Sequence, residues 1–238
     1  MNDALRVEGL VTGYGKQEIV HDISIDAHPG QITCIFGPNG SGKSTVIKAI
    51  AGLLPAWSGR ITLGDKDLTG LPVHSMVRNG IVMMPQGGGV FPRFTVMENL
   101  RMGGYALDKR HLVEERIETL IADYPNLQRR RHTPAGSLSG GEQMMVAIAR
   151  ALITDPAYVM LDEPSAGLSP ALVHETIERV VALKERGVGV LMVEQNIREA
   201  LPVADHVYVF AGGKRKFSGN GDDIKGDDHL MSIYMGGN

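Results

Sequence analysis

A glycine-rich segment at residues 37–45 reads GPNGSGKST and matches the pattern of a phosphate-binding loop. Glycines allow successive backbone N–H groups to curl around phosphate oxygens, and the helix that follows adds the partial positive charge of its N-terminus. We expect Lys43 to reach the β- and γ-phosphates of a nucleotide and the Ser44 hydroxyl to ligate Mg²⁺. The predicted nucleotide-binding residues of this loop are Gly37, Pro38, Asn39, Gly40, Ser41, Gly42, Lys43, Ser44 and Thr45.

Two carboxylates at the end of an apolar run are a second group that could do chemistry. Asp162 and Glu163 directly follow Ala157–Leu161, a run typical of a buried strand in a parallel sheet. Ligands of open α/β sheets bind beyond the carboxyl ends of the strands. We therefore expect Asp162 to bind Mg²⁺, directly or through an intervening ligand, and Glu163 to polarise an attacking water. The alternative is that the pair only caps a turn.

A second glycine-rich turn lies in the segment LSGGEQ at residues 138–143, where a helix is expected to begin. Such a turn is also an anion-binding helix N-terminus, with a hydroxyl and backbone N–H groups that face whatever lies in front of it. Because one nucleotide needs only one such cradle, two cradles in one chain predict a dimer. Each nucleotide would contact the phosphate loop of one subunit and the second turn of the other.

Alternating strands and helices must position these residues. Continuous apolar runs predict buried strands, and apolar residues at helical spacing predict helices. The expected core elements are strands at 31–36, 157–161 and 188–193 and helices at 46–54 and 170–185. Residues 87–150 are expected to be mostly helical, with helices at 95–101, 109–121 and 140–152. The alternation predicts an α/β fold with a parallel sheet and an inserted helical subdomain.

The composition argues against several classes of protein. The chain has 238 residues, with 24 Lys and Arg, 27 Asp and Glu and a formal net charge of −3; this balance argues against nucleic acid as the main ligand. Cys34, the single cysteine, favours a reducing compartment. The N-terminal segment lacks the apolar core of a signal peptide, and no stretch approaches the ~18 apolar residues of a membrane helix. We therefore expect no membrane span.

The order of these motifs resembles that of the ATP-binding-cassette (ABC) ATPases over nearly the whole chain. Besides the phosphate loop and the LSGGE signature, it includes Tyr14 in an early Gly-Tyr-Gly, Gln86, MLDE at 160–163 and VEQ at 193–195. The resemblance implies a P-loop NTPase core with a parallel sheet, an N-terminal antiparallel β subdomain and an inserted helical subdomain. In these terms residues 1–238 form one ABC ATPase domain, with a core at 1–86 and 154–238 and a helical subdomain at 87–153.

The resemblance also implies roles for individual residues in the hydrolysis of Mg-ATP. Tyr14 would stack on adenine, and Gln86 would contact Mg²⁺ and couple the site to the helical subdomain. The signature residues Ser139, Gly140 and Gly141 would face the γ-phosphate of ATP bound to the partner subunit. The implied catalytic residues are Lys43, Glu163 and Gln195, and the implied metal-site residues are Ser44, Gln86 and Asp162.

Longer segments resemble a narrower group, the ATP-binding subunits of branched-chain amino acid transporters. They are GVFPRFTVMENL at 89–100, EPSAGLSP at 163–170 and VEQN at 193–196. This resemblance implies an importer with two permease subunits, a second, non-identical ABC ATPase and an extracytoplasmic substrate-binding protein reached through the permeases. The chain would be peripheral at the cytoplasmic face of the inner membrane. Importers of urea and short-chain amides use very similar subunits and are an alternative.

Two other classes of function fit the sequence less well. An ABC ATPase that acts on DNA or ribosomes would carry a long coiled-coil insertion between Lys43 and Ser139, or a second cassette, and this sequence has neither. A small-molecule kinase with a phosphate loop would leave the LSGGE segment unexplained. The sequence therefore favours a transport ATPase.

Two positions depart from the wider ABC pattern. Gln195 stands where most ABC ATPases have a histidine that contacts the γ-phosphate, and an amide can donate a hydrogen bond there but cannot carry a proton. Ser169 stands where an aspartate usually links the two subunits. Both departures resemble the narrower group, whose transporters pair two different ATPases. We therefore expect a non-identical partner, and slower hydrolysis at the site built on this chain's own phosphate loop.

Overall fold

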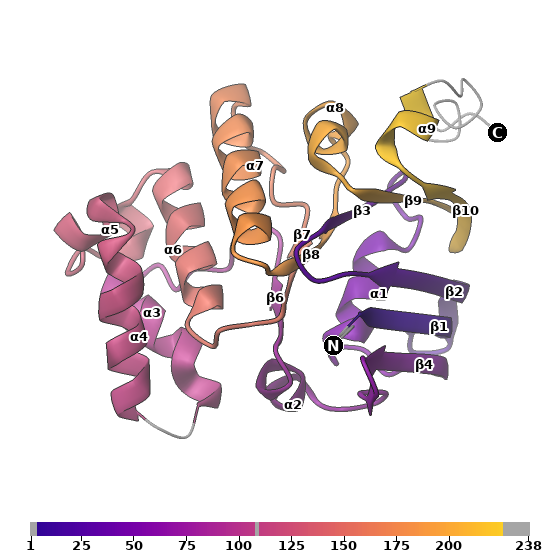
Figure 1. The fold of residues 1–238 in the computed structure, drawn as a ribbon, viewed down its shortest axis with the longest axis horizontal. Helices are drawn as coiled ribbons and strands as arrows, with labels where there is room; N and C mark the ends of the chain where they lie inside the picture. Colours follow the sequence, from indigo (N-terminus) through magenta and orange to yellow (C-terminus); the bar gives the residue numbers. More distant parts are fainter. Residues whose placement is uncertain (1–3, 108–109, 226–238) are drawn as a thin grey trace.

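Two β-sheets organise the chain in the computed structural model, which describes residues 4–107 and 110–225 (Figure 1). The first sheet is antiparallel, in the order β2-β1-β4-β5. Its strands are β1 (Leu5–Tyr14), β2 (Gln17–Ala27), β4 (Ser58–Leu63) and β5 (Lys66–Asp67). Buried and exposed residues alternate at the start of β1, as expected for a sheet with one face on the core.

The second sheet contains the strands that lead to the predicted site. Its order is β10-β9-β3-β8-β7-β6, and all neighbours are parallel except β9 and β10. The strands are β3 (Ile32–Phe36), β6 (Ile81–Met84), β7 (Tyr158–Asp162), β8 (Gly189–Val193), β9 (His206–Ala211) and β10 (Lys214–Gly219). Every residue of β3, β7 and β8 is buried, which explains why these strands are continuous apolar runs in the sequence.

The helices fall into two groups. Those near the sheets are α1 (Lys43–Ile50), α2 (Val73–Arg78), α7 (Pro170–Glu185), α8 (Ile197–Ala200) and α9 (Gly221–Lys225), with the 3-10 turn η3 (Leu201–Val203). The others are α3 (Val96–Gly103), α4 (Arg110–Ala122), α5 (Pro125–Arg129) and α6 (Gly140–Leu152), with the 3-10 turns η1 (Gly104–Ala106) and η2 (Ala135–Ser137). In Figure 1, α3–α6 gather on the side away from the antiparallel sheet.

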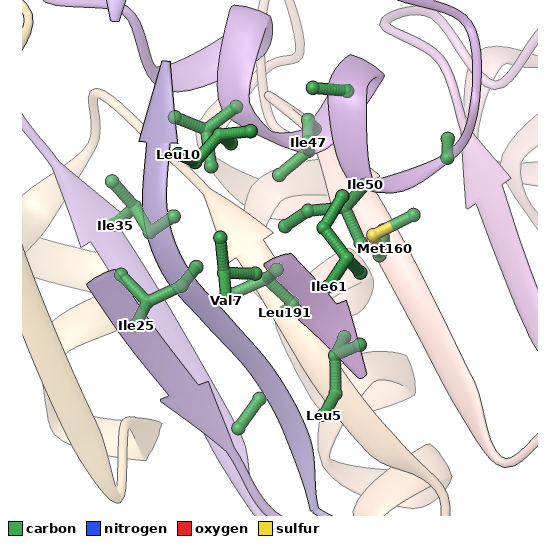
Figure 2. Packing of buried hydrophobic residues seen from close by; sticks show 14 of the residues in the cluster. Leu5, Val7, Leu10, Ile25, Ile35, Ile47, Ile50, Ile61, Met160 and Leu191 are labelled. Carbon is green, nitrogen blue, oxygen red and sulfur yellow. The ribbon is translucent and has the colours of Figure 1, made fainter. Parts of the chain in front are cut away.

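A core between the two sheets holds the helix that follows the phosphate loop. Helix α1 contacts β1 and β2 of the antiparallel sheet and β7 of the parallel sheet. In Figure 2, Leu5, Val7 and Leu10 of β1 surround the same apolar space as Ile47 and Ile50 of α1. Each fully buried aliphatic side chain of this kind contributes about 1.5–3 kcal/mol. This packing fixes α1, the helix that follows the phosphate loop, between the two sheets.

Helix α6, which begins at the LSGGE segment, is shared by two further cores. Val146 and Ala149 pack with apolar residues of α3 and α4. We call α3–α6 the helical group. Met144, Ala147 and Ile148 pack instead with residues of the parallel sheet and of α7. The paired methionines at 144 and 145 are buried. The signature turn therefore stands on a helix that bridges the helical group and the sheet.

The predicted α/β fold is confirmed, and the main errors concern boundaries. The expected strands at 31–36, 157–161 and 188–193 correspond to β3, β7 and β8, and α6 and α7 have the expected bounds. Helix α1 ends at Ile50 rather than reaching Leu54, because Gly52 takes a positive φ of 75° that turns the chain. The division into a core and a helical subdomain at 87–153 stays a prediction. Lys109, the expected start of α4, and the segment 226–238 lie outside the described residues.

None of the described helices has the length and apolar character that crossing a bilayer requires.

Candidate functional site

The phosphate loop lies between β3 and α1, as the motif requires. Gly37 begins the loop with a φ of 152°, and Gly40 and Gly42 also have positive φ values. A Cβ atom at Gly37 would stand 2.2 Å from the carbonyl oxygen of Phe210, which belongs to the backbone of β9. Only glycine can therefore bring the loop this close to the neighbouring strand.

We expect Gly37→Ala to lower the free energy of unfolding by about 3 kcal/mol and to weaken ATP binding, because the loop must move away from β9. Gly70→Ala is a matched control, since Gly70 also has a positive φ but a Cβ there meets no atom within 4 Å. Urea unfolding and titration with a fluorescent ATP analogue measure the two effects. Equal unfolding free energies for the two variants, with unchanged affinity in Gly37→Ala, would contradict this role.

Lys43 is buried at the base of the loop, with 4% of its surface exposed. Its Nζ donates hydrogen bonds to the carbonyl oxygens of Gly37 at 2.8 Å and of Pro38 at 3.2 Å. Burial lowers the pKa of the Lys43 ammonium, and the nearby carboxylates, led by Glu163, oppose that shift. A buried ammonium held by the loop itself is suited to attract phosphate groups to this position.

The donor set at this end of the sheet fits Mg²⁺ bound to a phosphorylated ligand. The hydroxyl of Ser44 donates to Oδ1 of Asp162 at 2.7 Å, although the two residues are far apart in sequence. Hydroxyl and carboxylate oxygens are the protein ligands that Mg²⁺ prefers. The buried hydroxyl of Ser41 has no hydrogen-bond partner among the described residues, which fits a loop shaped around a phosphate. The residues that could hold the metal are Ser44 and Asp162. Gln86, the third predicted metal-site residue, donates a long hydrogen bond to the neighbouring Glu163 at 3.4 Å.

Glu163 lies just beyond β7 in a strained conformation. Its φ is 48°, a left-handed value that is uncommon for a residue other than glycine and that clusters at functional sites. Its Oε1 accepts a hydrogen bond from Nε2 of Gln195 at 2.8 Å and is 3.9 Å from Nζ of Lys43. Its Oε2 accepts a longer hydrogen bond from Gln86 at 3.4 Å. The structure therefore brings Lys43, Gln86, Glu163 and Gln195 together.

Asn39 and Tyr14 border this cluster in different ways. Asn39 accepts a hydrogen bond from Nε2 of Gln195, which links the phosphate loop to the loop after β8. Tyr14 is the last residue of β1 and has 48% of its surface exposed. The following strand, β2, packs near the loop, because a Cβ at Gly42 would lie 3.3 Å from a methyl carbon of Val20. Tyr14 is thus on the β1–β2 hairpin, whose second strand packs beside the loop.

The signature turn points outward at the start of α6. Ser139 and Gly140 are exposed, and Ser139 and Glu142 cap the helix reciprocally. A Cβ at Gly141 would lie 2.7 Å from Leu172 of α7. No hydrogen bond or ion pair between described residues joins the turn to the phosphate loop. The backbone N–H and the hydroxyl of Ser139 both donate hydrogen bonds to the carboxylate of Glu142.

Two contacts near the site are not evident from the motifs. Arg150 on α6 donates to the carbonyl oxygens of Gly88 and Gly89, and its guanidinium lies 5.3 Å from the ring centre of Phe91. It thereby ties the loop after Gln86 to the signature helix.

Glu194 is a buried carboxylate beside Gln195. An acidic residue directly after the buried run 188–193 is the signal that could have found it, by the argument applied to Asp162.

Comparison with known families decides what this arrangement is. The sequence model for the ABC transporter family matches residues 20–166, which include the phosphate loop, Gln86, the signature and Asp162-Glu163. This chain belongs to the ABC transporter family. Membership implies that this ABC ATPase binds nucleotide and hydrolyses ATP.

Relatives of this ABC ATPase work in more than one kind of transport. It is 38% identical over 233 residues to BraG, the high-affinity branched-chain amino acid transport ATP-binding protein of Pseudomonas aeruginosa. The alignment covers 98% of this chain and 100% of BraG. The chain is 34% identical to LptB, the lipopolysaccharide export system ATP-binding protein of Haemophilus influenzae, with 98% and 97% of the two chains covered. Relatives named for the transport of different substrates are thus all ATP-binding proteins of transport systems.

A solved structure supports the fold assignment. The ADP conformation of MJ1267, an ATP-binding cassette of an ABC transporter, is 32% identical to this chain and superimposes with a TM-score of 0.86 over 99% of each chain. The predicted P-loop core with antiparallel and helical additions is therefore the ABC ATPase fold.

Proposed function

We propose that this ABC ATPase energises the uptake of branched-chain amino acids through separate permease subunits. The observation that carries the ATPase part is the position of the Glu163 carboxylate, 2.8 Å from Nε2 of Gln195 and 3.9 Å from Nζ of Lys43. The likeness to BraG, together with the segments at 89–100 and 163–170, supports amino acid import over lipopolysaccharide export.

In the proposed mechanism the chain positions ATP and a water molecule. Lys43 and the loop amides bind the β- and γ-phosphates, while Tyr14 stacks on the adenine. Glu163 accepts a hydrogen bond from the attacking water and orients it toward the γ-phosphate. Mg²⁺, when bound at Ser44 and Asp162, supplies positive charge that stabilises the phosphates. Gln195 holds the Glu163 carboxylate through its amide N–H.

The exposed signature turn supports a head-to-tail pair of ATPase subunits. One nucleotide would lie between the phosphate loop of one subunit and Ser139, Gly140 and Gly141 of the other. The serine hydroxyl and the helix N-terminus would stabilise negative charge on the γ-phosphate. Closure of the pair around ATP and reopening after hydrolysis would move the helical group, which is joined to the site by the loop after Gln86.

The surface beside that loop supports a permease as the partner. Phe91 and Phe94 are each about two-fifths exposed, with ring centres 5.4 Å apart, and such exposed aromatic pairs are typical of interaction sites. Arg150 connects the backbone before Phe91 to the signature helix. We therefore place the permease contact here, where movement of α6 reaches the surface. We also propose that the chain is a peripheral subunit at the cytoplasmic face of the inner membrane, held there by its permeases.

The side-chain amide of Gln195 supports two parts of the proposal. One is slower ATP hydrolysis at the site built on this chain's phosphate loop, and the other is a second ATPase subunit that is not identical to this one. Gln195 donates to Glu163 and Asn39, but it cannot carry a proton as histidine does. We expect Gln195→His to raise the turnover of the assembled pair by a few-fold, up to about tenfold, because histidine can carry a proton at this position. Steady-state hydrolysis between pH 6 and 8 measures the effect. Turnover equal to that of the wild-type pair would count against a slow site caused by Gln195.

Native purification tests the proposed assembly. The tagged full chain is extracted from membranes of its host in a mild detergent, and its partners are identified by mass spectrometry. We expect two permeases and a second ABC ATPase, with the genes of an amino acid receptor nearby. Receptors for urea or amides would instead indicate one of those substrates, and lipopolysaccharide export components would indicate export rather than import. Recovery of ribosomes or DNA alone would refute the transport function.

A further inference from the structure

We propose that Glu194 is a positioning residue that holds together the two loops bearing Glu163 and Gln195, a role that rests on the ATPase function proposed above. Glu194 directly follows β8, and 2% of its surface is exposed. Burying a carboxylate is costly unless hydrogen bonds replace its water shell. The mechanism described above does not use this group, so its burial at the site requires another explanation.

The carboxylate of Glu194 accepts hydrogen bonds from backbone N–H groups in two different loops. Its Oε1 accepts from Ser165 at 2.9 Å, in the loop that follows β7. Its Oε2 accepts from Gln195 at 3.0 Å and from Asn196 at 3.3 Å, in the loop that follows β8. One side chain therefore joins the ends of two neighbouring strands.

These two loops carry the central contact of the candidate site. Glu163 lies two residues before Ser165, and its Oε1 accepts the 2.8 Å hydrogen bond from the side chain of Gln195. The backbone N–H of Glu163 donates to Val193 at 3.0 Å, and that of Glu194 donates to Ile35 of β3 at 3.2 Å. Glu194 thus lies where β3, β7 and β8 end, and it sets the separation of Glu163 and Gln195.

Only a carboxylate of this length satisfies both loops. The groups on either side of Glu194 are N–H donors, so each needs an acceptor. Glutamine would present an oxygen to one loop and its own N–H₂ donors to the other, and could satisfy only one of them. Aspartate keeps both oxygens and the charge but is one methylene shorter, so it cannot reach both loops without moving the backbone. The two variants therefore break the same link in different ways.

The test compares Glu194→Gln and Glu194→Asp with the matched control Asp205→Asn, in the full chain purified with its membrane partners. Asp205 also accepts a backbone hydrogen bond, from Ile32 at 2.8 Å, but at the opposite end of β3. We expect both Glu194 variants to lower kcat at least about tenfold while the dissociation constant of a fluorescent ADP analogue stays within about twofold, because misplacement affects the reacting geometry more than binding. Asp205→Asn should leave kcat unchanged.

Two further readouts separate positioning from a general loss of structure. Hydrogen exchange should become about tenfold faster or more at the amides of Ser165, Gln195 and Asn196 in the Glu194 variants and stay unchanged there in Asp205→Asn. In a Gln195→Ala background, Glu194→Gln should lower kcat by less than it does in the wild type, because part of its effect acts through Gln195.

Specific outcomes would overturn the proposal. Unchanged exchange at these amides in both Glu194 variants, or a kcat loss no greater than that of Asp205→Asn, would show that Glu194 does not hold the loops for catalysis. The exchange result does not depend on hydrolysis, so it tests the link even if the chain proves inactive. Hydrolysis lost in Glu163→Gln but retained in Glu194→Gln would remove the positioning role and leave the proposed function in place.

Discussion

Glu163→Gln is expected to lower kcat for ATP hydrolysis by about 10²–10⁴-fold while ATP affinity changes little. The amide has nearly the same shape as the carboxylate, but it has lost the negative charge that orients and polarises water. Its oxygen can still accept the hydrogen bond that Gln195 donates at 2.8 Å in the wild type. Phosphate release under saturating Mg-ATP gives kcat, and a fluorescent ATP analogue gives the affinity.

The matched control for this prediction is Glu178→Gln. Glu178 lies on α7, is exposed and has His174 as its ion-pair partner, so its carboxylate is remote from the cluster around Glu163. Its kcat should match that of the wild type. Glu163→Gln with wild-type turnover would show that another group orients the water.

Lys43→Ala should lower kcat/KM for ATP hydrolysis by about 10²–10³-fold, through weaker binding as well as slower turnover. The ammonium is buried, and in the structure its hydrogen bonds go to the carbonyl oxygens of Gly37 and Pro38. Preorganised donors at a position where negative charge develops are worth this much in enzymes. Initial rates over a range of ATP concentrations separate the two contributions.

Lys48→Ala is the control for loss of a lysine from the same helix. Lys48 is in the last turn of α1, far along the helix from the loop. It should retain wild-type kcat/KM. If Lys43→Ala loses no more activity than Lys48→Ala, the phosphates are not bound at this loop in the way we describe.

Local patterns in the sequence predict much of the site because the chemistry there depends on short segments. The phosphate loop occupies consecutive residues, so its pattern and its position between a strand and a helix are both visible in the sequence. The place of Asp162 follows from the buried run before it, since a polar residue after such a run lies at the edge of the sheet. The structure pairs this carboxylate with the Ser44 hydroxyl at 2.7 Å.

Contacts between segments that are distant in sequence could not be predicted in the same way. The hydrogen bonds of Gln195 to Glu163 and Asn39 depend on which strands are neighbours in the sheet, and the order β3-β8-β7 is not encoded in any one of them. The place of Glu194 after the buried run 188–193 is visible in the sequence, but its partners could not be predicted, because they are backbone N–H groups that carry no sequence signal. The link from Arg150 to Gly88 and Gly89 likewise appears only when α6 packs beside that loop.

Strand β1 also shows where pattern recognition fails. It spans Leu5–Tyr14, but register shifts interrupt its pairing with β2 between Val7 and Gly13. Irregular pairing disturbs the alternation of apolar and polar residues on which strand prediction depends. The resemblance to ABC ATPases implied an antiparallel N-terminal subdomain, whereas the residues alone did not reveal this strand.

Uptake of radiolabelled leucine tests the central claim most directly. The native host would carry Glu163→Gln in place of the wild-type chain, with immunoblots of the membrane fraction showing equal amounts of the two proteins and urea uptake measured in parallel. We predict that high-affinity leucine uptake is lost in the variant and that urea uptake is unchanged. Leucine uptake at the wild-type rate would contradict the account of this chain as the ATP-hydrolysing subunit of a branched-chain amino acid importer.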